Sequence, residues 1–277
     1  MNKLITELQR LYFLGNQRWN GEGVLTAQIV ERCVAGELNV AFDLVGANGM
    51  ARALVVEFED SGDWQHVANL YQAVQDELGL PAPALSVSGQ PGYALWFSLA
   101  DAVPVAQAGV LLAALRSRYL ADLPASRVGL RPAVDTIARV TLAPSRHPAS
   151  GKWAAFIDPS LGGMFIDEPW LEMTPNQDKQ AELLAAINSI SAAEFQAALS
   201  VLHGVSPTDP APTDAEPVSP GVVAAQRRSS LNVGGNYRDP QSFLLAVMND
   251  TSASARHRIA AAKALLPCYP GGVEENL

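Results

Sequence analysis

The feature that most constrains the fold is the order of strand and helix patterns between residues 51 and 142. Strand patterns occur at 51–58, 84–88, 93–99 and 137–142, and amphipathic helix patterns fall at 63–78 and 105–119. This β-α-β-β-α-β order is typical of ferredoxin-like and RRM-like domains, in which two helices pack on one face of an antiparallel sheet. It predicts an α+β fold with the other sheet face free to carry a site.

The flanking patterns add elements to this core. Helices are predicted within 1–15, 26–34 and 177–202, and residues 39–45 are predicted to form an added N-terminal hairpin with 51–58 across Gly46-Ala47-Asn48-Gly49. A Pro-rich stretch near 205–221 cannot form a core and predicts a flexible linker. We therefore expect an α+β domain at 1–204, a linker at 205–236 and a small C-terminal helical hairpin at 237–277.

Composition and charge exclude several classes of protein. The chain is 48% hydrophobic, yet no apolar run approaches the roughly 20 residues that a membrane span needs, so we expect a cytoplasmic protein with no membrane partner. The two cysteines lack companions at metal-ligand spacing. A formal net charge of -9 disfavours a broad electrostatic grip on nucleic acid. Any contact with phosphates is therefore expected to be local or bridged by a metal ion.

Two acidic residues stand out on the first core strand. Glu57 and Glu59 are two positions apart, so their side chains point to the same face of the sheet. Paired carboxylates on a central strand are used in metal-assisted phosphoryl transfer. The alternative interpretation is a solvated strand face on which Glu simply alternates with apolar residues.

The stretch that follows resembles a known family. The acid-bearing strand, a helix, and then Ser-Val-Ser-Gly-Gln-Pro-Gly-Tyr-Ala-Leu-Trp-Phe at 86–97 are similar to the catalytic core of the archaeo-eukaryotic primase superfamily, the primase-polymerases, over roughly residues 40–160. The resemblance implies that Glu57 and Glu59 bind Mg²⁺ or Mn²⁺ and that Ser88 and Gly89 hold a nucleotide. It also implies a third acid at Asp135, for which a turn-capping role is the alternative.

The resemblance is incomplete at one position. The family's hairpin histidine falls on Ala94, whose methyl group cannot donate to a phosphate. The resemblance also implies that basic residues at the end of the last strand and in the following loop contact phosphates, and His147 among them could substitute for the missing histidine. The alternative is a solvated loop. This predicted basic group is Arg139, Arg146, His147 and Lys152.

The C-terminal segment and the core together leave two functional hypotheses. Residues 239–267 are similar to a small helical segment of phage and mobile-element proteins, which implies a docking module for DNA or a protein partner. Folding back of this segment onto the main domain is the alternative. The first hypothesis is a primase-polymerase-like nucleotidyltransferase of a phage or mobile element, acting on nucleotides and DNA or RNA. The second is a catalytically inactive module of the same fold that recruits partners.

Overall fold

The computed structural model describes residues 2–133 and 139–204, together with Leu244 and Leu245. The chain divides into two compact units, 1–211 and 212–277. The predicted linker and C-terminal hairpin thus lie outside the described residues, apart from Leu244 and Leu245, which are helical. Among the helices that the structure describes, none is long and apolar enough to cross a membrane.

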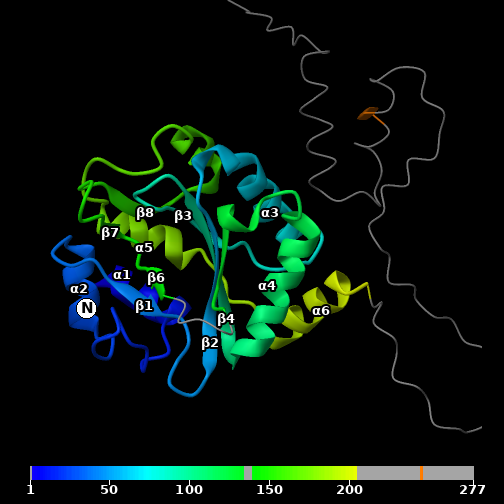
Figure 1. Ribbon diagram of the computed structural model, residues 1–277, viewed down its shortest axis with the longest axis horizontal. Helices are drawn as coiled ribbons and strands as arrows, with labels where there is room; N and C mark the ends of the chain where they lie inside the picture. The colour runs from blue at the N-terminus through cyan, green and yellow to red at the C-terminus, as the bar shows by residue number, and fades with distance from the viewer. Residues whose placement is uncertain (1, 134–138, 205–243, 246–277) are drawn as a thin grey trace, which may run out of the picture. The chain divides into compact units, whose positions relative to one another are not determined.

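A six-stranded antiparallel sheet forms the centre of the first unit (Figure 1), with strand order β5-β2-β4-β3-β8-β7. Helices α3 (Trp64–Asp76) and α4 (Val105–Tyr119) connect β2 to β3 and β4 to β5. The predicted α+β class is therefore confirmed. The strands are Met50–Phe58 (β2), Ala84–Val87 (β3), Tyr93–Pro104 (β4), Val128–Arg131 (β5), Ser145–Arg146 (β7) and Trp153–Ile157 (β8).

The strand that follows α4 in the sheet differs from the predicted one. It is β5, which pairs with β2, whereas the predicted strand at 137–142 contributes β6 (Arg139–Thr141) to a separate two-stranded sheet with β1 (Ala41–Asp43). The predicted hairpin is likewise correct only at its turn. Gly46 N donates to Met50 O at 2.9 Å and Val45 bridges Ala51, but β1 pairs with β6 instead of β2. Phe42 and Val140 lie opposite each other there and are both buried, which stabilises this pairing.

One face of the large sheet packs against α3, α4 and α6 (Ala192–Leu202). Leu54, Val56 and Phe58 of β2 point to this face, as the period of two along a strand requires. The capping box of Ser191 and Glu194 begins α6. The buried helix residues of this layer are Val67, Leu70, Val74, Ala108, Leu111, Leu112, Leu115, Phe195 and Ala198.

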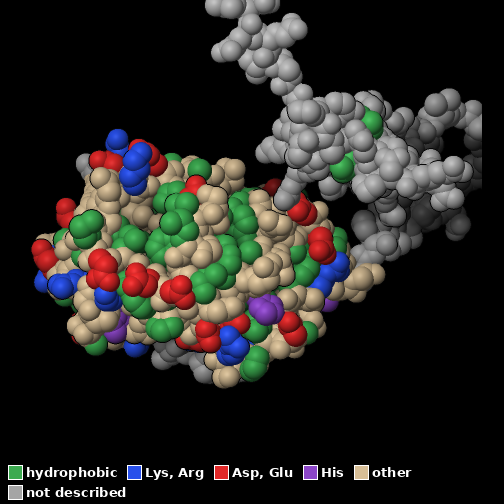
Figure 2. All heavy atoms as spheres, turned by 90° about the horizontal axis from the view of Figure 1, so that it is seen from above, with side chains coloured by type: hydrophobic (Ala, Val, Ile, Leu, Met, Phe, Trp, Pro, Cys, Tyr) green, Lys and Arg blue, Asp and Glu red, His purple; other side chains and the backbone are tan. Residues whose placement is uncertain are grey.

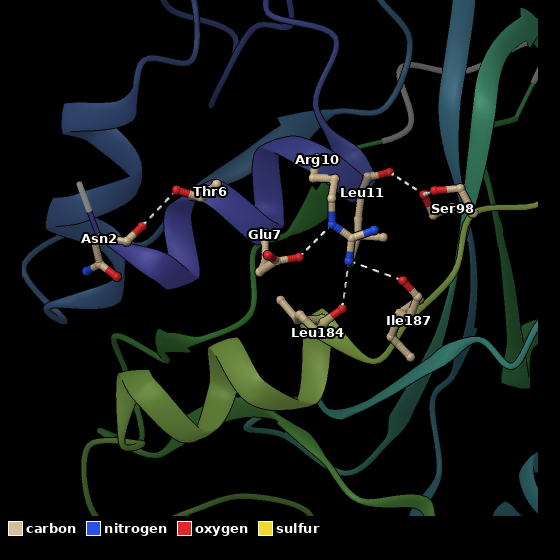
Figure 3. Close-up of polar contacts among 9 residues, drawn as sticks. Asn2, Thr6, Glu7, Arg10, Leu11, Ser98, Leu184 and Ile187 are labelled. Carbon is tan, nitrogen blue, oxygen red and sulfur yellow. Dashed lines mark hydrogen bonds and ion pairs between the residues drawn. The ribbon is translucent and has the colours of Figure 1, made fainter.

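The opposite face, predicted to be open, carries a second layer made of α1 (Lys3–Tyr12), α2 (Ala27–Val34) and α5 (Gln177–Ala185). Figure 3 shows how α1 is held: Arg10 donates to the Leu184 and Ile187 carbonyls at 3.0 and 3.1 Å, and the Ser98 hydroxyl donates to the Leu11 carbonyl at 2.7 Å. Buried aromatic rings, among them Tyr12 stacked on Phe156, fill the space beneath. The prediction of a free face is therefore wrong where these helices cross the sheet.

Acidic and basic side chains are interspersed on the face of the first unit that Figure 2 presents, with hydrophobic side chains between them. Over the whole chain, acidic residues outnumber basic ones, which gives the formal net charge of -9. Nonspecific binding to a phosphate backbone needs Lys and Arg in excess, so this face does not supply it.

Candidate functional site

The predicted acid pair lies at the C-terminal end of β2, on the sheet face that packs against α1, α2 and α5. Ala53 and Val55 of this strand lie in the second core layer, and Glu57 follows on the same side because side chains alternate along a strand. Glu57 lies opposite Ala94 of β4 and opposite Gly129 of β5. Glu57 is half-buried and Glu59, directly after the strand, is exposed. The pair thus lies where the buried layer ends and solvent begins.

A cavity of about 340 Å³ opens at this point. Polar side chains from several segments line it, among them Glu57 and Glu59 from the end of β2, Ser88 and Gln90 from the β3–β4 turn, and His147 from the β7–β8 turn. The structure thus brings together four of the residues predicted from the sequence, and adds Gln90. Ala94, at the position of the family's histidine, also lines this cavity.

The β3–β4 turn is fixed in place beside the cavity. The Ser88 hydroxyl donates to the Gln90 carbonyl at 2.6 Å and accepts from the Gln90 N–H at 3.1 Å. Gly89 has a φ of +73°, and a Cβ there would lie 2.8 Å from the Ala154 backbone nitrogen. Both facts favour glycine. Gly89 is therefore buried in close contact with β8, and its two neighbours, Ser88 and Gln90, line the cavity.

Glu57 has a cationic partner that the sequence did not reveal. Arg131 of β5 donates from Nε to the Glu57 Oε2 at 3.1 Å. Gly129 makes room for this carboxylate, because a Cβ there would lie 2.9 Å from Oε2. Burial raises the pKa of the Glu57 carboxyl above its ordinary value of 4.5; Arg131 lowers it and Glu59 raises it, and burial dominates.

The other predicted basic residues have partners elsewhere, and the cavity's described lining includes none of them. Arg139 pairs with Asp43 at 3.1 Å, and Arg146 donates to the Gly151 carbonyl at 3.1 Å. Lys152 binds Glu172 and lies 5.3 Å from the Trp170 ring centroid. Asp135, the predicted third acid, lies outside the described residues.

The donor set of the cavity decides which metal it suits. Within residues 2–133 and 139–204, no group of three or more acidic, His or Cys side chains is placed to hold a metal ion. Mg²⁺ nevertheless commonly binds through one or two carboxylates, with phosphate and water oxygens completing its shell. Glu57 and Glu59 at one cavity fit that mode, provided that the cation shares or displaces the Arg131 contact to Glu57.

Three residues of the site were missed by sequence reasoning. Arg131 and Gly129 belong to no motif, and Gln90 lies within the 86–97 stretch at a position to which the resemblance assigns no role. A glycine inside a strand often marks a close approach of another group, so Gly129 was the one detectable signal. That signal was hidden because residues 128–131 were not recognised as a strand.

No protein-family model and no curated protein matches the chain. Among solved structures, it is similar to the AEP domain of the primase-polymerase of cyanophage S-2L, with a TM-score of 0.39 and 16% sequence identity. That similarity covers 66% of this chain and 96% of the phage domain. A similarity at this level is a distant similarity of the backbone fold. It is no evidence of a shared activity.

Proposed function

We propose that residues 1–204 form a primase-like domain, with a ferredoxin-like core, that binds a nucleotide together with Mg²⁺ or Mn²⁺. The observation that carries this proposal is the convergence of the Glu57–Glu59 pair, the Ser88 turn and His147 on one cavity. These residues come from three segments far apart in the sequence. Their meeting is unexpected for a solvated strand face, which was the alternative interpretation of the acid pair.

The carboxylates form the cation side of the proposed site. Glu57 and Glu59 supply oxygen ligands, with Asp135 as the predicted third acid, and phosphate oxygens of the nucleotide complete the shell. The bound metal supplies charge neutralisation at the phosphates. The chain carries a formal net charge of -9, so a polyphosphate enters more favourably with its cation than alone.

Hydrogen-bond donors form the opposite side of the cavity. The Ser88 hydroxyl and the His147 ring both line it, and the Ser88 hydroxyl becomes a donor to a phosphate once it gives up its bond to the Gln90 carbonyl. In this assignment His147 supplies the imidazole that position 94 lacks. Arg139, Arg146 and Lys152 contribute only if their present contacts are exchanged for phosphate contacts.

Binding without nucleotidyl transfer is the second candidate, and two observations favour it. Ala94 lines the cavity without providing a donor, and Arg131 occupies one oxygen of Glu57. In this candidate the domain presents a nucleotide or a nucleic-acid end, and residues 239–267 recruit DNA or a protein partner. A primer-extension assay with Mn²⁺ and all four nucleoside triphosphates separates the candidates, because only an active transferase lengthens the primer.

Electron paramagnetic resonance of Mn²⁺ tests the shared binding step. We expect the signal of free Mn²⁺ to fall when protein and a nucleoside triphosphate are both present, beyond the decrease that the nucleotide alone causes. A Glu57→Gln, Glu59→Gln variant keeps the shape of both side chains and removes their charge, so the additional decrease should vanish. An equal decrease with this variant would place the metal elsewhere.

A further inference from the structure

His147 lines the cavity and is held by a tight turn. Its backbone N–H donates to the Lys152 carbonyl at 2.7 Å, and its carbonyl accepts from the Gly151 N–H at 2.9 Å. The ring is half-buried and lines the cavity, across from the β3–β4 turn. Both ring nitrogens have partners, so the surroundings decide which nitrogen carries the proton.

The contacts at Nδ1 identify it as an acceptor. The Ser150 N–H points to Nδ1 at 3.3 Å, and an N–H can only donate. The Ser150 Oγ lies 3.1 Å from Nδ1 and itself accepts from the Lys152 N–H at 3.3 Å. Its hydroxyl hydrogen is therefore available for Nδ1. A neutral imidazole with an accepting Nδ1 carries its proton on Nε2.

His147 Nε2 contacts the side-chain amide of Gln90 at the amide nitrogen. Two donors cannot bond to each other, so a protonated His147 Nε2 requires the two ends of the amide to be exchanged, which assigns the Gln90 oxygen to the contact. Gln90 is held in turn by the Ser88 hydroxyl, which accepts from its backbone N–H. The contact between Gln90 and His147 thus links two turns across the cavity, the β3–β4 turn and the β7–β8 turn.

We propose that His147 binds an anionic oxygen through Nε2–H, and that the Gln90 amide oxygen occupies this donor until such a ligand arrives. This inference rests on the proposed function, and it assigns an anionic oxygen of the ligand to the His147 Nε2–H. Nε2–H has no free lone pair, so His147 in this form cannot ligate a metal ion through Nε2, and its Nδ1 lone pair is already directed at Ser150. The cavity is then divided into a cation side at Glu57 and Glu59 and an anion side at His147, which suits a metal-bound polyphosphate.

The first test needs no ligand. The chain contains only four histidines, so a long-range ¹H–¹⁵N correlation spectrum of the full protein can be assigned with a His147→Asn variant. At pH about 8, where imidazole is ordinarily neutral, we expect His147 as the Nε2–H tautomer. A predominant Nδ1–H tautomer would overturn the assignment whatever the protein binds.

The second test uses inorganic tripolyphosphate with a fixed excess of Mg²⁺. A ligand oxygen and the Gln90 oxygen compete for one hydrogen, so Gln90→Ala should tighten tripolyphosphate binding by roughly 2- to 10-fold, the size of one hydrogen bond. Gln72→Ala, on the exposed side of α3, is the matched control and should leave affinity unchanged. His147→Asn should weaken binding.

The outcomes separate this inference from the function on which it rests. Wild-type binding that does not tighten in Gln90→Ala overturns the role of Gln90 and leaves the proposed function standing. Wild-type binding that His147→Asn leaves unchanged overturns the anion role of His147 alone. If no variant binds tripolyphosphate and the wild type binds no nucleotide, the proposed function fails as well.

Discussion

The Arg131 guanidinium bonds to the Glu57 carboxylate diagonally across the β2–β5 strand pair, with 3.1 Å between Nε and Oε2. In the register of these strands Gly129 is opposite Glu57, and Arg131 is opposite Val55. The missing side chain at Gly129 lets the carboxylate lean toward β5. A cation that enters the cavity must therefore compete with the Arg131 guanidinium for this carboxylate. This competition lowers the affinity of the site for the cation.

Removal of Arg131 should strengthen binding of Mn²⁺ in the absence of nucleotide. The half-exposed pair is worth about 0.5 to 1 kcal/mol, so Arg131→Gln should raise the Mn²⁺ affinity roughly 2- to 5-fold at pH about 8. Calorimetry measures this directly. Arg139→Gln is the matched control, because it breaks a pair of the same 3.1 Å length with Asp43 away from the cavity. Equal gains in both variants would point to overall charge as the cause.

Gly89→Ala should destabilise the domain and weaken nucleotide binding together. The substitution places a side chain at a φ of +73° and a Cβ 2.8 Å from the Ala154 nitrogen, so backbone strain and a steric clash add to about 2–5 kcal/mol of unfolding free energy. Gly79→Ala has a φ of +64° and nothing within 4 Å, and should cost only about 1–2 kcal/mol. Urea unfolding compares the two. Similar losses would show that the contact with β8 is unimportant.

The raised pKa of Glu57 should make its contribution to the free energy of unfolding decrease as the pH rises. Its pKa is raised in the folded state, so its contribution is most favourable below pH about 4.5 and is lost as the pH rises through the raised pKa. Relative to wild type, Glu57→Gln should therefore become more stable as the pH rises from 4 to 8. Glu172→Gln should show the opposite trend, since the hydrogen bond from Lys152 lowers the pKa of that carboxyl. Denaturant unfolding at several pH values checks both signs.

Local patterns predicted the helices and most strands well, because periodicity and caps are local properties. The helix expected at 105–119 is α4, with the same bounds, since Pro104 precedes it and Leu111, Leu112 and Leu115 mark its buried face. Strand β5 was missed because Val-Gly-Leu-Arg is short and a glycine interrupts its pattern. The pairing of β1 with β6 joins segments about 100 residues apart, and no local signal specifies it.

The site was predictable where a motif carried it and unpredictable where only packing did. Glu57 and Glu59 were selected by their spacing on a strand and Ser88 by the family resemblance, and the structure places all three at one cavity. Whether the basic residues reach the cavity depends on partners such as Asp43 and Glu172, which no pattern identifies. Likewise α1 is visibly amphipathic in the sequence, but the surface that it covers is decided by contacts such as Arg10 with α5.

Calorimetric titration with Mn²⁺ and a nucleoside triphosphate, comparing the wild type with a Glu57→Ala, Glu59→Ala variant, tests the central claim most directly. Asp178→Ala, Glu182→Ala is the charge-matched control, because it removes two exposed carboxylates of α5 that do not line the cavity. We predict metal-dependent binding by the wild type and the control, and a loss of at least about 10-fold in affinity, ~1.4 kcal/mol, for the Glu57 and Glu59 variant. Unchanged binding by that variant would contradict a cation site at the end of β2.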